Sequence, residues 1–450
     1  MEQIMNPALE GASLIMPQGP GVMAAFSYTG IADEIQAYQT SAWIGTALLT
    51  SPIYDVYGPD AAKLLNSVCT NDFSTLGLKG LRHAVLCNEK GQILCDGVVI
   101  RIAEDRYRTY WINPVISYYV ESSDLDVHGE DISGQEYFIQ IDGEKSLEIL
   151  EDAFQADLHD IKFARHRIQT VDGMDVRVIR LGMSGNLAYE IHGPMSDFEA
   201  IYHKVWESGK KFNARRLGLQ TYNLFNHTEA GFPNINLHYP LPWLESGEGL
   251  AKHCCSLPQY AFYNLNRILV GSAGDDVEQR FVTPYDVGWE FLLKFNHDFV
   301  GRKALEEMAE KPHRTVVTLE WNAEDVGKVF ATRLDPAADP CDDISAPYDL
   351  NYFATTQNFS FSYRADKVFS GEQEIGITSG RIISYTYNSM ISLAFIDSEY
   401  AKEGDELEIL WGTPGTHQMK VRAKIARYPY NSNFIRNEKK DVEEIPHFSK

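Results

Sequence analysis

The expected secondary structure changes along this chain of 450 residues. Runs of β-branched and aromatic residues predict strands at 84–86, 93–102, 107–112, 137–141, 176–181 and 314–321, and helical stretches between them are predicted at 60–68, 145–153, 195–208 and 302–309. An acidic segment with two Asp-Pro pairs, 335–348, is expected to be a loop or linker. Only short strands are predicted after it, at 353–363, 374–378, 390–396, 406–410 and 419–426. The sequence therefore predicts an α+β protein with a C-terminal all-β barrel or sandwich.

Composition narrows the range of partners. The formal charge of −23 argues against nucleic acid or an anionic membrane, because phosphate binding requires a basic surface. The six cysteines have no Cys-x-x-Cys spacing, and we expect reduced thiols in a cytoplasmic protein. We find no apolar run long enough for a membrane span. The sequence does not indicate the oligomeric state.

Two kinds of cofactor site are not expected from the motifs. His253, beside Cys254 and Cys255, lacks a partner pair at metal-ligand spacing, so no metal site is predicted. No Gly-x-Gly-x-x-Gly segment follows a predicted strand, which disfavours a dinucleotide-dependent enzyme.

The segment 182–191, GMSGNLAYEI, places one carboxylate after a glycine-punctuated turn that leads into an apolar strand. A carboxylate fixed there can hold a neutral heterocycle that is rich in hydrogen-bond donors. The alternative is a hairpin whose Glu190 points to solvent.

Several motifs in the same order resemble the folate-dependent aminomethyltransferase superfamily, whose type member is the T-protein of the glycine cleavage system. They are 57–61 YGPDA, 69–72 CTND, 88–96 NEKGQILCD, 110–113 YWIN, 182–191, 229–231 EAG, 283–286 TPYD, 298–302 DFVGR and 376–380 GITSG. The resemblance spans residues 20 to 430 and implies a multi-domain T-protein-like fold, with antiparallel sheets and helices around a central folate channel.

The departures from the family pattern concern the substrate. The Asp-Asp pair of the family is Cys95-Asp96 here, so Asp96 matches the catalytic aspartate, and the first carboxylate of the 182–191 motif is missing. The longer chain, the aromatic insert 236–247, NLHYPLPWLESG, and the segment 283–301 together look more like the aryl O-demethylase branch, such as the vanillate and syringate O-demethylases. That branch transfers a methoxy methyl group to tetrahydrofolate.

The resemblance implies a division of the chain and of the site. Residues 1–50 and 137–235 are expected to form the folate-binding α+β domain, residues 51–136 and 236–305 a second α+β domain at the active site, and residues 306–450 the C-terminal β domain. Tetrahydrofolate is the expected cofactor, and a small methoxy-aromatic acid is the expected substrate. The candidate cofactor-binding residues are Glu190, Asn113, Asp96 and Tyr189.

The candidate catalytic residues are Tyr239, Asp96, His238 and Tyr28. A tyrosine or histidine can deliver a proton or hydrogen bond to the departing phenolate oxygen, although either residue can equally be packed in a loop. A methoxybenzoate carboxylate needs a cation, so the candidate substrate-binding residues are Arg82, His83, Arg101 and Trp243, with arginine favoured for its bidentate geometry. Each of these charges has the alternative of an ordinary solvated surface group.

Three functions remain open at this point. The first is a tetrahydrofolate-dependent O-demethylase that yields a phenol and 5-methyltetrahydrofolate, in aromatic catabolism and one-carbon metabolism. The second is an aminomethyl- or N-methyltransferase whose product is 5,10-methylenetetrahydrofolate, which the retained Asp96 supports. The third is a folate-binding protein of the same fold without catalytic activity.

Overall fold

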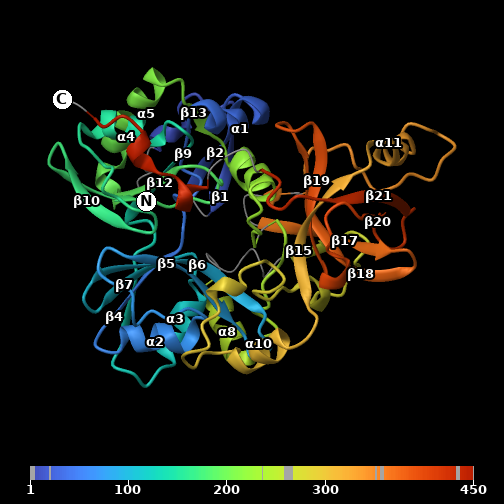
Figure 1. Ribbon diagram of the computed structural model, residues 1–450, viewed down its shortest axis with the longest axis horizontal. Helices are drawn as coiled ribbons and strands as arrows, with labels where there is room; N and C mark the ends of the chain where they lie inside the picture. The colour runs from blue at the N-terminus through green and yellow to red at the C-terminus, as the bar shows by residue number, and fades with distance from the viewer. Residues whose placement is uncertain are drawn as a thin grey trace.

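Three large sheets and a separate two-stranded hairpin organise the described part of the molecule (Figure 1). The computed structural model describes residues 6–19, 22–235, 237–257, 267–349, 352–354, 359–431 and 436–448. A six-stranded sheet and a five-stranded sheet come from the first half of the chain, and the third sheet closes into a barrel in the second half. This arrangement confirms the predicted α+β class and the C-terminal β domain.

The six-stranded sheet carries the 182–191 segment. Its strands in spatial order are β10 (His166–Val171), β11 (Met174–Ile179), β12 (Ala188–Pro194), β9 (Glu136–Asp142), β3 (Trp43–Gly45) and β13 (Arg215–Leu217). Neighbouring strands are antiparallel except β13, which runs parallel to β3. Helices α4 (Ser146–Phe154) and α5 (Phe198–Lys211) bury their apolar stripes in the core of this sheet, and α1 (Ile31–Thr40) lies beside β3 and β13. A separate hairpin, β1 (Leu14–Gly19) and β2 (Val22–Ser27), precedes α1.

The five-stranded sheet is antiparallel throughout. Its order is β5 (Leu81–Cys87), β6 (Ile93–Ala103), β7 (Arg106–Tyr110), β4 (Ile53–Tyr57) and β8 (His128–Asp131). Its core also takes in residues of four helices, α2 (Ala61–Val68), α3 (Val115–Glu121), α8 (Glu248–Ser256) and α10 (Arg302–Ala309).

The C-terminal barrel has six strands. They follow the order β17 (Phe359–Ser370), β18 (Gln373–Ser384), β19 (Ser389–Asp397), β15 (Arg314–Trp321), β21 (Met419–Ala426) and β20 (Glu406–Trp411), and the pairing of β20 with β17 closes the barrel. Strands β14 (Arg267–Val270) and β16 (Tyr352–Ala354) add to β17 from outside. Helix α11 (Ala323–Ala331) follows β15, and its first turn is capped by the Asn322 side chain, which accepts a hydrogen bond from the Asp325 amide.

The remaining helical turns are short. The segment before the central loop combines α6 (Leu219–Thr221), the π-helical turn η3 (Tyr222–Asn226) and α7 (His227–Glu229). The 3-10 turns are η1 (Pro7–Leu9), η2 (Met195–Asp197), η4 (Glu278–Arg280), η5 (Glu290–Leu292), η6 (Ser398–Tyr400), η7 (Asn437–Lys439) and η8 (Val442–Glu444). Within the described part of the chain, no helix is long and apolar enough to cross a membrane.

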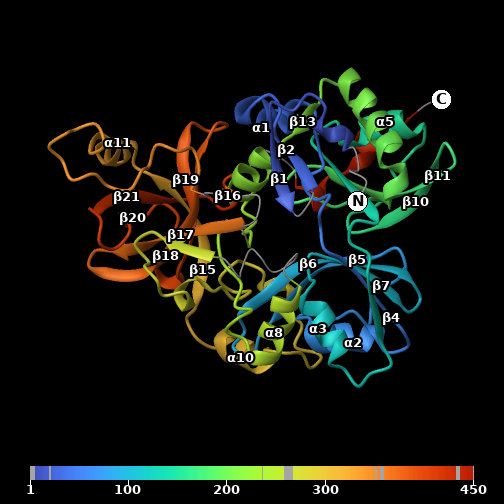
Figure 2. The same ribbon diagram turned by 180° about the vertical axis from the view of Figure 1, so that it is seen from behind.

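The C-terminal tail, residues 436–448, departs from the predicted boundary at 306–450. In both views it runs beside α4 and α5 rather than with the barrel (Figures 1 and 2). The reason is the buried guanidinium of Arg180, which needs acceptors and finds them in the carbonyl oxygens of Asn437 and Lys440, at 2.9 and 2.6 Å. Val442 also packs into the core of the six-stranded sheet. Strand β14 likewise leaves its predicted domain, 236–305, by pairing with β17, and the other boundaries stay a prediction.

Candidate active site

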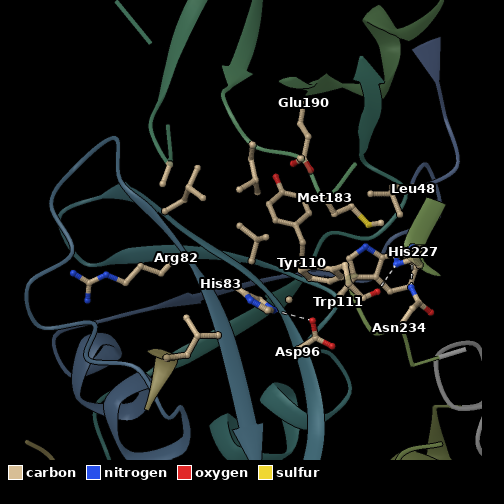
Figure 3. Close-up of a pocket in the computed structure, with 18 of the residues that line it drawn as sticks. Leu48, Arg82, His83, Asp96, Tyr110, Trp111, Met183, Glu190, His227 and Asn234 are labelled. Carbon is tan, nitrogen blue, oxygen red and sulfur yellow. Dashed lines mark hydrogen bonds and ion pairs between the residues drawn. The ribbon is translucent and has the colours of Figure 1, made fainter. Parts of the chain in front are cut away.

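A cavity of about 780 Å³ lies between the six-stranded and the five-stranded sheets. Its wall draws on β5 and β6, the end of β7, β12, the helical segment 219–229 and the start of the tail. Figure 3 shows Glu190 entering from one side and the pair of His83 and Asp96 from the other, with Tyr110 and Trp111 between them. The wall is mostly apolar, so the few polar groups on it define what the cavity can hold.

Glu190 is the polar group of the β12 side. Its carboxylate is buried, and none of the described residues donates a hydrogen bond to it; Nε2 of His192 lies 3.6 Å from Oε2. Burial, and then the nearby Asp142, raise the pKa of Glu190 to about 8. A buried carboxyl group that faces a cavity without a donor is prepared to receive N–H donors from a ligand. The hairpin alternative, with Glu190 in solvent, is wrong.

Asp142 is a second carboxyl group of this region that the sequence analysis missed. It ends β9 and pairs across the sheet with Ala188, so it lies behind the turn that leads to Glu190. Burial raises the pKa of Asp142 to about 7. Gly182 packs closely against Ala188 and Asp142. A Cβ at this glycine would come within 2.2 Å of the Ala188 Cβ and 3.3 Å of Asp142 Oδ1. An Asp at the end of a predicted strand, directly before Gly143, was the available signal.

Asp96 and His83 form the polar group on the opposite side. They lie on the paired strands β6 and β5, and Nε2 of His83 is 2.8 Å from Oδ2 of Asp96. The Tyr239 hydroxyl donates a longer hydrogen bond, 3.5 Å, to the other oxygen, Oδ1. Burial and the Asp96 charge raise the pKa of Tyr239, which keeps its hydroxyl protonated. The His83 ring is held by Trp289 in an edge contact at 4.8 Å.

The central wall is made of hydrogen-bonded aromatic residues that sequence reasoning also missed. The Tyr110 hydroxyl donates to Glu136 Oε2 at 2.9 Å and is 2.9 Å from Nδ1 of His192, whose pKa is lowered by burial and nearby arginines. The Tyr222 hydroxyl accepts from Gln140 Nε2 at 3.2 Å. These bonds fix the rings that separate Glu190 from Asp96.

His227 and Asn234 close the wall on the side of the helical segment. The Asn234 amide donates to Nε2 of His227 at 3.1 Å, so Nδ1 carries the proton that faces the Phe232 carbonyl, 3.2 Å away. Burial lowers the pKa of His227 to about 3, and the ring is therefore a neutral wall residue at physiological pH. The π-helical turn beside it has no sequence signal that a periodicity search can detect.

Seven predicted site residues lie outside the described wall of the cavity, Tyr239 and six others. Tyr28 donates to the Ala8 carbonyl, Arg101 donates to the carbonyls of Leu76 and Glu104, and Trp243 donates to the Leu94 carbonyl. These contacts are structural, because each side chain satisfies a backbone acceptor away from the cavity. The others are Tyr189, in the core of the six-stranded sheet, the buried Asn113, and His238, whose ring is bonded to Thr228 and Asn234.

Arg82 does line the cavity, yet its guanidinium extends away from Glu190 and Asp96 (Figure 3). Its Nη2 donates to Thr75 Oγ1 at 2.7 Å. Tyr239 lies behind the wall and reaches the cavity only through Asp96. The structure thus brings Glu190, Asp96, His83 and Arg82 to one cavity.

The residues present fit tetrahydrofolate. The pterin ring of this cofactor offers adjacent N–H donors, and Glu190 is a buried acceptor to which no described group donates. Gly182 and Met183 border the same region of the cavity. Bound there, tetrahydrofolate supplies the nitrogen that accepts a one-carbon unit.

Comparisons with known proteins agree with this site. The model of the GCVT N-terminal domain matches residues 14–237. The chain is 49% identical over 423 residues to the sesamin methylene transferase of Sinomonas sp. (strain No.22), covering 93% of this chain and 92% of that protein. It is 26% identical over 443 residues to the syringate O-demethylase of Sphingobium sp. (strain NBRC 103272 / SYK-6), covering 92% of each.

A solved structure shows the same fold at low sequence identity. The glycine cleavage system aminomethyltransferase T from Bartonella henselae superposes with a TM-score of 0.64 and 15% identity, covering 94% of this chain and 96% of that one. The T-protein-like fold expected from the motifs is thereby confirmed. The domain match and the sequence identity over more than nine-tenths of the chain together show that this chain belongs to the GCVT family and is a tetrahydrofolate-dependent one-carbon transferase.

Proposed function

We propose that this enzyme takes a one-carbon unit from an aryl ether, transfers it to tetrahydrofolate and releases the phenol. The observation that carries the proposal is that one cavity presents Glu190 on one side and the Asp96–His83 pair on the other, with aromatic side chains between them. Glu190 orients the pterin, and the aromatic wall packs against the substrate ring. Holding the acceptor nitrogen and the ether carbon in line is the main contribution of such a site.

Asp96 and His83 are assigned the role of assisting the departure of the ether oxygen. With a methyl ether, one carbon–oxygen bond breaks, one carbon–nitrogen bond forms, and the proton lost by the acceptor nitrogen ends on the phenol. With a methylenedioxy ring the exchange occurs twice, so two carbon–oxygen bonds are replaced by two carbon–nitrogen bonds and both protons end on the catechol. Asp96 accepts a hydrogen bond from Nε2–H of His83, so Nδ1 of the neutral ring carries a lone pair. This nitrogen takes up the proton lost by the acceptor nitrogen, and the imidazolium, stabilised by Asp96, then donates it to the leaving oxygen. Tyr239 acts through Asp96 and is a positioning residue.

A neutral aryl ether fits the described wall better than a methoxybenzoate. The three cations on that wall are each occupied: Arg82 donates to Thr75, Lys294 to the Phe291 carbonyl and Arg436 to Glu438. The Arg82 guanidinium points away from Asp96 (Figure 3). Similarity to a protein named for methylene transfer supports a donor whose two ring oxygens share a methylene bridge, with 5,10-methylenetetrahydrofolate and a catechol as products.

The methoxy-aromatic acid is the second candidate, supported by the similarity to a syringate O-demethylase. It requires Arg82 to exchange the Thr75 hydroxyl for the substrate carboxylate, which is a side-chain rotation on the cavity wall. Its folate product is 5-methyltetrahydrofolate.

The product distinguishes the candidates. The enzyme is incubated anaerobically with tetrahydrofolate and one of three donors, a methylenedioxybenzene, a methoxybenzoate or an N-methyl amine, and the folate is identified by mass. We expect 5,10-methylenetetrahydrofolate and a catechol from the first donor. Turnover of the amine alone would replace the proposal by an amine-side enzyme, and no turnover of any donor would leave a folate-binding protein.

The Arg82→Ala variant separates the two ethers. Turnover of a neutral ether should change less than about threefold, because no charge of that substrate meets the guanidinium. Turnover of a methoxybenzoate should show a KM raised about tenfold or more, as expected for a lost charged hydrogen bond.

A further inference from the structure

A cluster of histidine and carboxylate side chains joins the C-terminal tail to the loop after α4, away from the active-site cavity. Asp157 and His159 lie on that loop, and His447 lies on the tail. One potential ligand atom from each of the three side chains lies within 4.8 Å of the other two. The rings of His159 and His447 are stacked, with centroids 3.7 Å apart and planes 17° apart.

The hydrogen-bond partners of His159 define where its protons are. Its Nε2 is 3.1 Å from the Ile445 carbonyl oxygen, which can only accept, so Nε2 carries a proton. Its Nδ1 then faces two further acceptors, Glu151 Oε1 at 2.8 Å and Asp157 Oδ1 at 3.2 Å. This nitrogen needs either a second proton or a cation.

Both ring nitrogens of His447 also face hydrogen-bond acceptors. Its Nε2 is 3.2 Å from Glu443 Oε2, and its Nδ1 is 2.7 Å from Asp157 Oδ2. If every nitrogen carried a proton, two imidazolium rings would be stacked face to face with like charges. Neutral rings avoid this repulsion when both Nε2–H groups point outward, which directs both Nδ1 lone pairs toward Asp157.

We propose that His159 Nδ1, His447 Nδ1 and the Asp157 carboxylate bind a divalent transition-metal ion that fastens the tail to the loop after α4. Two imidazoles with a carboxylate favour Zn²⁺ over Mg²⁺ or Ca²⁺, which prefer all-oxygen ligands. Glu151 Oε1 borders the site from its buried side, and water completes the coordination. Ile445 and Glu443 orient the two rings through Nε2, as outer partners do at known metal sites.

The position of the site gives the metal a structural role. The tail that carries His447 begins with Arg436 and Glu438, which line the active-site cavity. The ion links Asp157 and His447, which are 290 positions apart in the chain, so it should raise the thermal stability of the whole chain and protect the tail.

Zinc binding to the full-length chain without a histidine tag tests the proposal. The protein is stripped with a chelator, and ZnCl₂ is added in a calorimeter and in a thermal melt. We expect one equivalent of zinc to bind and the apparent Tm to rise. His447→Ala should weaken zinc binding by more than about 100-fold, and Glu443→Ala by about 10- to 100-fold. Both side chains are well exposed, so the variants should fold without zinc.

His128→Ala is the matched control, because His128 is an exposed histidine beside a carboxylate, Asp126, remote in sequence from the tail. It should bind zinc as the unmodified chain does. A second readout is trypsin cleavage after Lys439 or Lys440, which zinc should slow in the unmodified chain and not in His447→Ala. The proposal is overturned if the unmodified chain binds no zinc, or if His447→Ala binds zinc equally well and the ion therefore sits elsewhere.

Discussion

At the scale of single residues, the raised pKa of Glu190 predicts a pH-dependent affinity for folate. Pterin donors stabilise the ionised carboxylate, so binding must remove the proton that the free enzyme holds below about pH 8. The dissociation constant for 5-methyltetrahydrofolate should be lowest above pH 8 and rise up to about tenfold per unit as the pH falls, about 100-fold at pH 6. Titrations from pH 6 to 9 measure this.

The Glu190→Gln variant removes the ionisable group, so it tests whether Glu190 causes the pH dependence of folate affinity. Its affinity should be about 10- to 100-fold lower at pH 8.5, since a charged hydrogen bond contributes about 1.5–3 kcal/mol, and nearly independent of pH. Glu130→Gln, which changes an exposed carboxylate paired with Arg106, should leave both properties unaltered. A pH-independent affinity in the unmodified enzyme would remove Glu190 from the cofactor site.

Asp96→Asn should affect turnover rather than cofactor binding. The amide cannot hold the His83 proton as a carboxylate does, so we expect kcat to fall about 10²- to 10⁴-fold, the usual range for lost acid–base assistance. The dissociation constant for 5-methyltetrahydrofolate should change less than about threefold. Asp105→Asn, on an exposed turn, is the control. Equal losses in cofactor binding and in turnover would instead assign Asp96 to the folate.

The site residues that could be predicted are those whose neighbours along the chain form a motif. Glu190 and Asp96 follow glycine turns in recognisable segments, and both face the cavity. Tyr239 and His238 lie on a loop, and the direction of a loop side chain depends on what it packs against. Tyr239 therefore meets Asp96, 143 positions away, from behind the wall, and the stacking of His159 on His447 was equally invisible in their spacing.

At the scale of elements, the close approach of β6 to β7 predicts the effect of a methyl group at Gly97. A Cβ at this position would lie 2.0 Å from the Tyr110 carbonyl oxygen and 3.1 Å from the Trp111 Cβ. Because these are backbone and wall atoms, the end of β7 must move. Gly97→Ala should lower the apparent Tm, at a cost of about 1–3 kcal/mol or more, and raise the KM for tetrahydrofolate.

Gly327→Ala is the matched control for that prediction. Gly327 lies within α11, where an added Cβ meets nothing within 4 Å, so alanine should stabilise the helix by about 0.5–1 kcal/mol. Thermal melts and steady-state kinetics of the two variants check the pair. An unchanged Tm for Gly97→Ala would mean that β6 and β7 can separate without cost.

The elements that the sequence predicted well have a strong local pattern. Strands β6, β9 and β15 appear within one or two residues of their expected positions, because β-branched runs and turn residues mark them. The π-helical turn η3 and helix α11 were missed: the first breaks the period on which helix detection rests, and the second follows directly after a strand.

At the scale of the whole molecule, the tail shows why domain boundaries were the weakest expectation. A boundary drawn from local pattern placed residues 306–450 together, whereas the buried Arg180 and the apolar side chain of Val442 fix the tail to the other end of the molecule (Figure 2). Contacts between residues more than 250 positions apart leave no periodic signal.

The same contacts give a prediction about how the tail is held. Arg180→Met keeps the buried volume and removes the bonds to Asn437 and Lys440, each about 1.5–3 kcal/mol for a charged donor. With chelator present, trypsin should cleave the tail after Lys439 or Lys440 faster than in the unmodified chain. The affinity for 5-methyltetrahydrofolate should fall several-fold, because the tail contributes to the cavity wall. The exposed Arg165→Met is the control. Cleavage at the unmodified rate would mean that the apolar contact of Val442 alone holds the tail.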